Sequence, residues 1–294
     1  MYANVVIGIN GLAGDQDAIA LAKALAPSAR RTLVNVRLVD MVPTKGSGGA
    51  FEVAESELSH ELLERMRQAY AGEAEVVSIA ALNVGAGLHH VATEQEADLI
   101  VVGSCHRGPV GRVLSGDDAR SALHLAPCAV AVAPAGYARG RGHIGAVGVA
   151  YDRSAPGEVA LAHAALLATD LGAKLRVREV MELHVYGAAG WASAAVMIED
   201  PEAVAAAARE RIGPIPGGEV DVTMGPLLIE LEELSEQVDV MVCGSRQQSA
   251  VKRVLLGSTS DHMMRHARSP LIVTPARDEQ HVVAWRELRS GAAV

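Results

Sequence analysis

The sequence predicts an α/β fold of two repeated Rossmann-like units, each a five-stranded parallel sheet with helices on both faces. Three observations predict this fold. Apolar, strand-like segments alternate with longer helix-like segments along the 294 residues. Half of the chain is hydrophobic but only 3% is aromatic, which favours close packing of helices on a sheet through small aliphatic side chains. Finally, one stretch of sequence occurs twice.

The repeated stretch reads ADLIVVGSCHRGPVGRVLSGDD at Ala97–Asp118 and VDVMVCGSRQQSAVKRVLLGSTS at Val238–Ser260. Both copies contain an apolar run that ends in Gly-Ser, then Arg-Val-Leu, then Gly, at the same spacing. The apolar runs do not alternate with polar residues, as is typical of parallel strands covered on both faces. A register kept over this length indicates internal duplication.

In the first copy, apolar segments predict strands and amphipathic segments predict helices. The expected strands are Val5–Ile9, Thr32–Val39, Ala74–Ala80, Leu99–Val102 and Cys128–Ala133. The expected helices are Asp15–Ala26, Glu52–Ala71, Ala86–Glu94 and Asp117–Leu125. Met41–Ala50, with a proline and several glycines, predicts a mobile loop.

A short Gly/Arg-rich linker, Ala135–Gly142, separates the copies, and the pattern then restarts. The expected strands are Ala146–Tyr151, Lys174–Val180, Glu219–Thr223, Val238–Val242 and Leu271–Thr274. The expected helices are Pro156–Leu171, Glu202–Arg211, Pro226–Glu236 and Gly257–Ala267, with a loop at Leu183–Ile198. The predicted domains are 1–135 and 143–276, followed by a polar tail, 277–294, that Trp285 anchors to the other domain or to a partner.

Ligands of such sheets bind at the carboxyl ends of the strands, where the strand order reverses. Gly257-Ser258-Thr259-Ser260 opens a helix there, and Ser258 with Asp261 is close to a capping box. Free N–H groups, hydroxyls and the nearby Arg246 and Arg253 suit a phosphate. An ordinary capped helix after a loop is the alternative interpretation.

These residues resemble the universal stress protein family in tandem form. ATP-binding members carry Asp after the first strand, and Gly-x-x-Gly, nine residues and Gly-Ser after the fourth. The second copy matches with Asp152, Gly244-Ser-Arg-Gln247, nine residues and Gly257-Ser258. The first copy departs further, with Asn10, Gly103-Ser-Cys-His106, nine residues and Gly116-Asp117.

The resemblance implies a stress-response regulatory module that binds ATP in its C-terminal domain, with Mg²⁺ as counter-ion. It implies no enzyme beyond slow ATP hydrolysis, since no general base is evident beside the phosphate loop. The implied site places Val180 near adenine and Arg246 or Arg253 near phosphate. Its residues are Asp152, Val180, Gly244, Arg246, Gln247, Arg253, Gly257, Ser258, Thr259 and Ser260. Gln247 replaces a glycine and either blocks the phosphate or donates an amide hydrogen bond to it.

The first copy is expected to be a structural partner that does not bind ATP. Asp117 would direct a negative charge at the polyphosphate, and one like-charge pair at ~4 Å costs up to about 4 kcal/mol at an effective dielectric of ~20. Two other functions stay open. One is a scaffold in which both sites have decayed, as Gln247 and Asp117 favour; the other is a thiol redox sensor using Cys105 or Cys243.

No metal site is predicted, because Cys105-His106 has no second Cys/His set at ligand spacing. Glu230, Glu232 and Glu233 are expected to be a solvated helix face.

The formal net charge of −9 argues against nucleic acid as a partner. No signal peptide or membrane span is expected, and three scattered cysteines fit a reducing cytoplasm. The expected assembly is an intramolecular pseudo-dimer that also forms a homodimer.

Overall fold

The computed structural model describes residues 1–39, 48–104, 117–140, 142–181, 201–245, 253–254 and 256–290. The first half of the chain contains five strands and the helices between them. The strands are β1 (Asn4–Gly8), β2 (Arg30–Leu38), β3 (Glu75–Ala81), β4 (Leu99–Gly103) and β5 (Ala129–Ala133). The helices are α1 (Gly14–Leu25), α2 (Gly48–Met66), α3 (Val84–Glu94) and α4 (Asp117–Leu123).

The second half repeats this alternation after a 3₁₀ turn, η2 (Tyr137–Arg139). The strands are β6 (Ala146–Ala150), β7 (Lys174–Met181), β8 (Gly218–Met224), β9 (Val240–Gly244) and β10 (Leu271–Thr274). The helices are α5 (Ala155–Leu171), α6 (Pro201–Ile212), α7 (Leu227–Glu236), α8 (Ser258–His266) and a final α9 (Glu279–Ser290).

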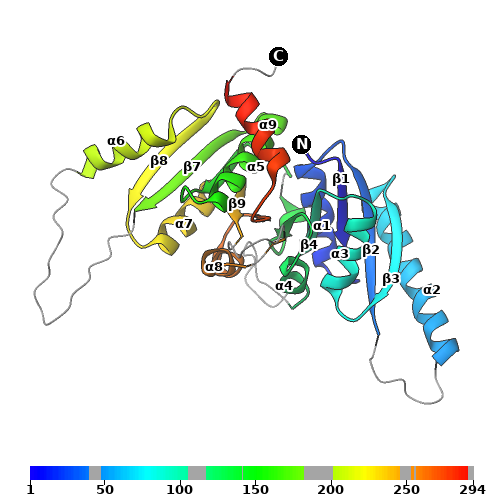
Figure 1. Ribbon diagram of the computed structural model, residues 1–294. Coiled ribbons are helices and arrows are strands. Elements are labelled where there is room, and N and C mark those ends of the chain that lie inside the picture. The colour runs from blue at the N-terminus through cyan, green and yellow to red at the C-terminus, as the bar shows by residue number, and fades with distance from the viewer. Residues whose placement is uncertain are drawn as a thin grey trace, which may run out of the picture.

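All ten strands join in one sheet, with the two halves side by side (Figure 1). The order is β3-β2-β1-β4-β5-β10-β9-β6-β7-β8, so each half has the same internal strand order. Neighbouring strands are parallel except β5 and β10, which pair antiparallel with Ala131 opposite Ile272. The prediction of two five-stranded parallel units is confirmed. Their fusion edge to edge into one sheet was not predicted.

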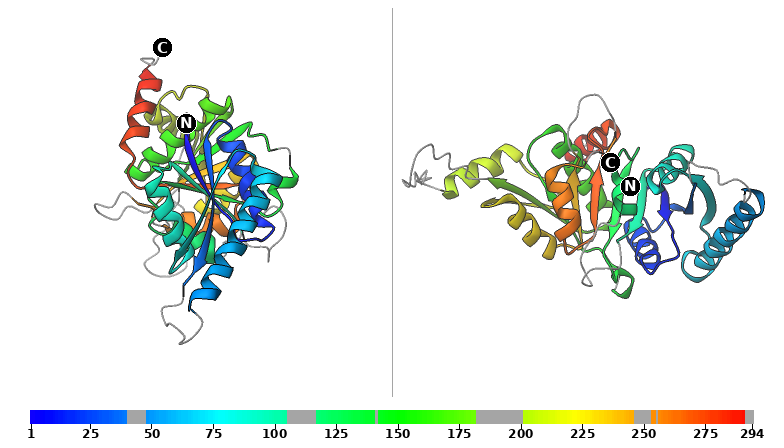
Figure 2. Two further views of the ribbon diagram at one scale, coloured as in Figure 1. Left: turned by 90° about the vertical axis from the view of Figure 1, so that its right-hand side faces the viewer. Right: turned by 90° about the horizontal axis from the view of Figure 1, so that it is seen from below.

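Helices cover both faces of this sheet, whose strands fan out because it is twisted (Figure 2). One core lies between the sheet and α1, α2 and α5, and it includes Leu21, Leu63 and Leu161. The other lies between the sheet and α3, α4, α7 and α8, and it includes Leu88 and Met263. Both cores contain side chains from both halves, so the two units form a pseudo-dimer with a continuous interior.

Equivalent carboxylates show the duplication at atomic detail. Asp98, just before β4, accepts hydrogen bonds from the backbone N–H groups of Ala3 and Asn4 at 2.7 and 3.3 Å. Asp239, just before β9, accepts from Gly145 and Ala146 at 2.8 and 2.9 Å. In both units, equivalent hydrogen bonds therefore join the start of the first strand to the start of the fourth strand.

Several local expectations need correction. The helix expected at Glu52–Ala71 begins earlier, at Gly48, and its last turn widens into a π-helix over Arg67–Ala71. Most of the tail is the helix α9, whose Trp285 is 2% exposed and which packs along α5. Most of the expected Met41–Ala50 loop and all of the Leu183–Ile198 loop lie outside the described residues. No helix in the described part of the chain is both long and apolar enough to cross a bilayer.

A buried polar contact fastens α9 to α5. Asp278 Oδ2 lies 2.9 Å from His163 Nε2 and 2.8 Å from His281 Nδ1, and the two imidazole rings stack at 4.0 Å. Asp278 Oδ1 also accepts the backbone N–H of His281 at 3.2 Å. Burial lowers the pKa of His163 despite the hydrogen bond to Asp278, so its imidazole is neutral at neutral pH. Burial alone would raise the pKa of Asp278, but the hydrogen bonds from both histidines outweigh it and hold that pKa well below its usual range.

Candidate functional site

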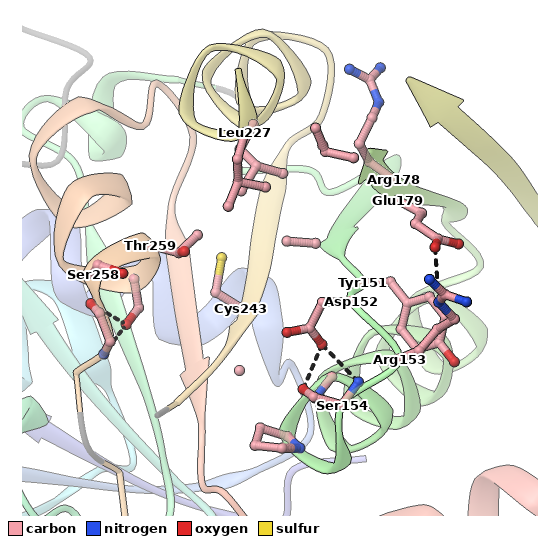
Figure 3. Close-up of a pocket in the computed structure, with 18 of the residues that line it drawn as sticks. Tyr151, Asp152, Arg153, Ser154, Arg178, Glu179, Leu227, Cys243, Ser258 and Thr259 are labelled. Atoms are coloured by element: carbon pink, nitrogen blue, oxygen red, sulfur yellow. Dashed lines mark hydrogen bonds and ion pairs between the residues drawn. The ribbon is translucent and has the colours of Figure 1, made fainter. Parts of the chain in front are cut away.

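A cavity of about 710 Å³ opens at the carboxyl ends of β6, β7 and β9 (Figure 3). β6 and β9 are neighbours in the sheet but connect onward in opposite directions, so the cavity lies where the strand order reverses. Its other walls are the first turns of α5, α7 and α8. The volume is within the range of small-ligand sites in proteins.

The first turn of α8 provides backbone donors on one side of the cavity. Its N-cap is Gly257, whose N–H donates to Ser260 Oγ at 2.8 Å. The N–H groups of Ser258, Thr259 and Ser260 belong to the first turn, where a helix offers no acceptor of its own. Ser258 and Thr259 lie on the opposite side of the cavity from Asp152 and Ser154 (Figure 3). The helix dipole and these donors suit an anion.

The capping arrangement differs from the predicted one. The sequence suggested Ser258 as the cap with Asp261 as its partner. In the structure, Gly257 is the cap and Ser260 is the residue that returns to it. The Ser258 hydroxyl is therefore not used as the cap of α8 and lines the cavity.

Asp152 lies across the cavity from α8, directly after β6. Its Oδ1 accepts hydrogen bonds from the N–H and the hydroxyl of Ser154 at 3.0 and 2.5 Å. Ser154 in turn caps α5, since its Oγ accepts the N–H of Gly157 at 3.1 Å. A Cβ on Gly157 would lie 2.3 Å from Asp152 Oδ1, so only glycine leaves room for this carboxylate.

Gly244 ends β9 at the floor of the cavity. A Cβ there would lie 2.8 Å from the carbonyl oxygen of Pro156 at the start of α5. The glycine is therefore required for the close approach of β9 to α5. The sequence interpretation assigned it to phosphate contact; its packing role is sufficient to explain it.

Charged side chains form the wall at the end of β7. Glu179 is 3% exposed and pairs with Arg153, whose Nε lies 2.9 Å from its Oε1. Arg153 has a positive φ of 60°, a backbone conformation that costs about 1–3 kcal/mol in a residue with a side chain. Arg178 points away to Asp221 and Glu230, at 2.8 and 3.4 Å. Glu230 is thus an ion-pair partner and not part of a solvated face.

Apolar side chains line the part of the cavity between α7 and β7. Leu227 and Leu231 reach it from α7, and Val180 and Met181 reach it from β7. Cys243 also faces it, but the side chain is almost fully buried and burial raises the pKa of its thiol to about 12. A flat apolar group would find contacts at this end and an anion at the α8 end.

The structure brings most of the predicted site residues together. Seven of them line the cavity: Asp152, Val180, Gly244, Gly257, Ser258, Thr259 and Ser260. Arg246 and Gln247 lie outside the described residues, so the role of the substituted glycine stays a prediction.

Arg253 is not among the described residues that line the cavity, and its place near phosphate stays a prediction. The neighbouring Val254 exchanges backbone hydrogen bonds with Leu125 and Ala126 of the first unit, at 2.9 and 3.1 Å. These hydrogen bonds place Val254 and its neighbour Arg253 beside the first unit. Burial lowers the pKa of His89 in the first unit, although its hydrogen bond to the Ala122 carbonyl oxygen acts to raise it. The positive charge of Arg253 lowers this pKa further.

The first unit arranges the same position differently. Asn10, which matches Asp152, lies with its Nδ2 3.4 Å from Oδ2 of Asp118 in the first turn of α4. The contact joins the end of the first strand to the first turn of α4, whereas in the second unit the cavity lies between Asp152 and the first turn of α8. Asp15 accepts the N–H groups of Asn10 and Gly11 at 3.0 and 2.8 Å, and its counterpart in register is Gly157. The Asp117 side chain lies outside the described part.

Sequence reasoning missed Arg153, Glu179 and Leu227 as cavity residues. A signal was present for two of them, because charged residues interrupt an apolar strand at Arg178-Glu179 and Arg153 occupies the place of Gly11 in the other copy. Leu227 could not be found in this way, since it is one apolar residue of an apolar helix turn.

The fold and cavity define a doubly wound α/β protein with two repeated units and a small-ligand pocket at the switch point of the second. The chain belongs to the universal stress protein family, whose sequence model matches residues 1–134 and 144–275. It is 29% identical over 209 residues to a universal stress protein of Mycobacterium tuberculosis, covering 66% of this chain and 69% of the relative.

Solved structures share the whole fold. A universal stress protein from Archaeoglobus fulgidus superposes with a TM-score of 0.67 at 19% identity, covering 94% of this chain and 97% of the other. A protein from Pseudomonas aeruginosa superposes with a TM-score of 0.63 at 15% identity, covering 99% and 98%. At these identities the likeness extends to the fold alone.

Proposed function

We propose that this universal stress protein is a regulatory module that binds one adenine nucleotide, ATP with Mg²⁺, in its C-terminal unit. The observation that carries the proposal is the cavity between Asp152 and the first turn of α8. The phosphates would lie at the N–H groups of Ser258–Ser260, and Mg²⁺ would offset their charge. Asp152 would face the ribose, and adenine would pack against Val180 and Leu227.

The first unit serves as the structural partner in this proposal. Its Asn10–Asp118 contact links the two positions that match opposite sides of the cavity, and Asp118 places a carboxylate beside the helix end that a phosphate would approach. Like charges at about 4 Å cost up to about 4 kcal/mol at an effective dielectric of about 20.

We expect any ATP hydrolysis to be slow. Asp152, a carboxylate that lines the cavity, already accepts two hydrogen bonds from Ser154 and is held away from the role of general base. A thiol redox function is disfavoured for Cys243, since a thiol with a pKa near 12 carries very little thiolate at neutral pH. Cys105 lies outside the described residues.

Isothermal calorimetry with Mg-ATP tests the proposal. Wild-type protein is expected to bind one nucleotide per chain. Ser258→Asp, which installs the residue of the first unit, is expected to weaken binding by up to about 1000-fold through charge repulsion. The matched control is Ser290→Asp, which adds the same charge at an exposed serine of α9 outside the cavity and is expected to leave affinity and stoichiometry unchanged.

Two results would contradict the proposal. Two nucleotides per chain would show that the first unit also binds. No heat with ATP would leave the alternative of a scaffold with two decayed sites.

A homodimer of whole chains is a further part of the proposal. It is motivated by the exposed Leu38 and Leu82 at the outer end of β2 and β3. Light scattering coupled to size exclusion measures the oligomeric state.

A further inference from the structure

Three side chains with metal-ligand chemistry meet on the outer side of α7 and α8. Glu232 comes from α7, and His262 and His266 come from α8, four residues apart and so on one face of the helix. One oxygen or nitrogen atom from each lies within 4.8 Å of the others. Glu232 was expected to be a plain solvated residue; instead its Oε1 lies 2.6 Å from His262 Nε2.

The orientation of His266 suits a ligand. Its Nδ1 lies 3.0 Å from the backbone oxygen of His262 and donates to it, which leaves the lone pair on Nε2. Metal-binding histidines characteristically donate their second ring nitrogen in this way. The two imidazole rings are stacked at 4.1 Å, and one nitrogen of each lies within 4.8 Å of the other.

The helices that carry these side chains are held firmly. Met263 and Met264 of α8 are fully buried in the core that also contains Leu231 and Leu234 of α7. The ligand side chains themselves are accessible, with His262 24% and Glu232 39% exposed. A metal ion could therefore enter from solvent and find ligands on two rigid elements.

Other histidine clusters in the described residues lack this combination. His90 and Glu94 are exposed and supply only two ligands. His163, Asp278 and His281 supply three, but His163 is 1% exposed and its Nδ1 is buried with no partner among the described residues. Asp278 Oδ1 there also accepts the backbone N–H of His281 in the first turn of α9.

We propose that Glu232, His262 and His266 bind a divalent transition-metal ion of the Zn²⁺ class. Two imidazoles and one carboxylate match the preference of Zn²⁺, and water would complete a four-coordinate site. The ion would bridge α7 and α8, which form two walls of the cavity. The site does not depend on the proposed nucleotide binding.

Co²⁺ and Zn²⁺ titrations of the full chain, freed of metal by dialysis against a chelator, test this proposal. Co²⁺ is expected to produce visible ligand-field bands that saturate at one ion per chain, and Zn²⁺ is expected to displace it and to raise Tm. His266→Ala is expected to weaken binding at least about 10- to 100-fold, since even the loss of a supporting partner of a ligand has an effect of this size.

Matched controls separate this site from adventitious histidine binding. His90→Ala is expected to leave both affinity and the spectrum unchanged. Glu232→Gln keeps the shape of the side chain and is expected to weaken binding without unfolding the protein, which circular dichroism verifies. The proposal is overturned if wild-type protein shows no saturable Co²⁺ spectrum, or if His266→Ala and Glu232→Gln bind Co²⁺ as wild type does.

Discussion

The two units of this chain have the same strand order, and in each unit a carboxylate just before the fourth strand, Asp98 or Asp239, binds the start of the first strand. The units differ at the ends of their first strands. In the first unit, Asn10 reaches across to Asp118. In the second, Asp152 turns back onto Ser154, and a cavity of about 710 Å³ separates it from α8. The difference shows that two copies of one fold can keep the same architecture while their described residues make different contacts at the ends of the first strands.

The position of one carboxylate decides much of this difference. The first unit carries it on the helix, at Asp15, where it satisfies the backbone of the loop. The second unit carries it on the strand end, at Asp152, and has glycine at the corresponding helix position. The first unit therefore has a negative charge at the helix position that hydrogen-bonds the loop backbone, whereas the second unit has it at the rim of the cavity.

The largest expected effect concerns the glycine that ends the fourth strand in each unit, Gly103 or Gly244, and packs against the start of that unit's first helix. A Cβ on Gly103 would lie 2.4 Å from the Gly14 carbonyl oxygen, and one on Gly244 would lie 2.8 Å from that of Pro156. We expect Gly103→Ala and Gly244→Ala each to lower the free energy of unfolding, by about 1–3 kcal/mol, with the larger loss at Gly103. Urea denaturation measures both. Gly140→Ala, whose nearest contact would be at 3.3 Å, is the control, and equal effects in all three variants would refute the packing argument.

A second prediction sharpens the contrast between Gly11 and Arg153, both of which have positive φ. We expect Arg153→Gly to relieve backbone strain but to destabilise the protein by about 1–2 kcal/mol, because the buried Glu179 loses its cation. The double variant Arg153→Gly with Glu179→Gln should recover wild-type stability. Chemical denaturation of wild type, the two single variants and the double variant completes the cycle. A stabilised Arg153→Gly single variant would mean that strain outweighs the ion pair.

The smallest expected effect concerns the buried contact between His163 of α5 and Asp278, just before α9. Burial lowers the pKa of His163 below that of an unfolded chain, so the unfolded state binds more protons as pH falls through about 6.5. Stability should therefore fall between about pH 7 and pH 5, by about 1.4 kcal/mol for each unit of pKa difference. Asp278, with its lowered pKa, contributes only below about pH 4.

Thermal unfolding across this pH range is the measurement. His163→Gln should have a shallower pH dependence than wild type, since it removes the titrating group. The same slope in both proteins would show that His163 does not govern the acid response.

Repetition made much of this protein predictable. The register between Ala97–Asp118 and Val238–Ser260 required two copies of one unit, and alternating segments required parallel strands with helices on both faces. The same register located the helix start at Gly257, and the family resemblance pointed to Asp152 after the first strand of the second copy. Both residues line one cavity. These features depend on local pattern and on strand geometry, and both are written in short stretches of sequence.

Only the tertiary structure decided how the copies join and which side chains share a space. Three contacts of this kind join residues far apart in sequence: the antiparallel pairing of β5 with β10, the pairing of Val254 with the first unit, and the ion pair of Glu232 with His262. Such contacts depend on how whole elements pack, and neither periodicity nor motif spacing records that packing.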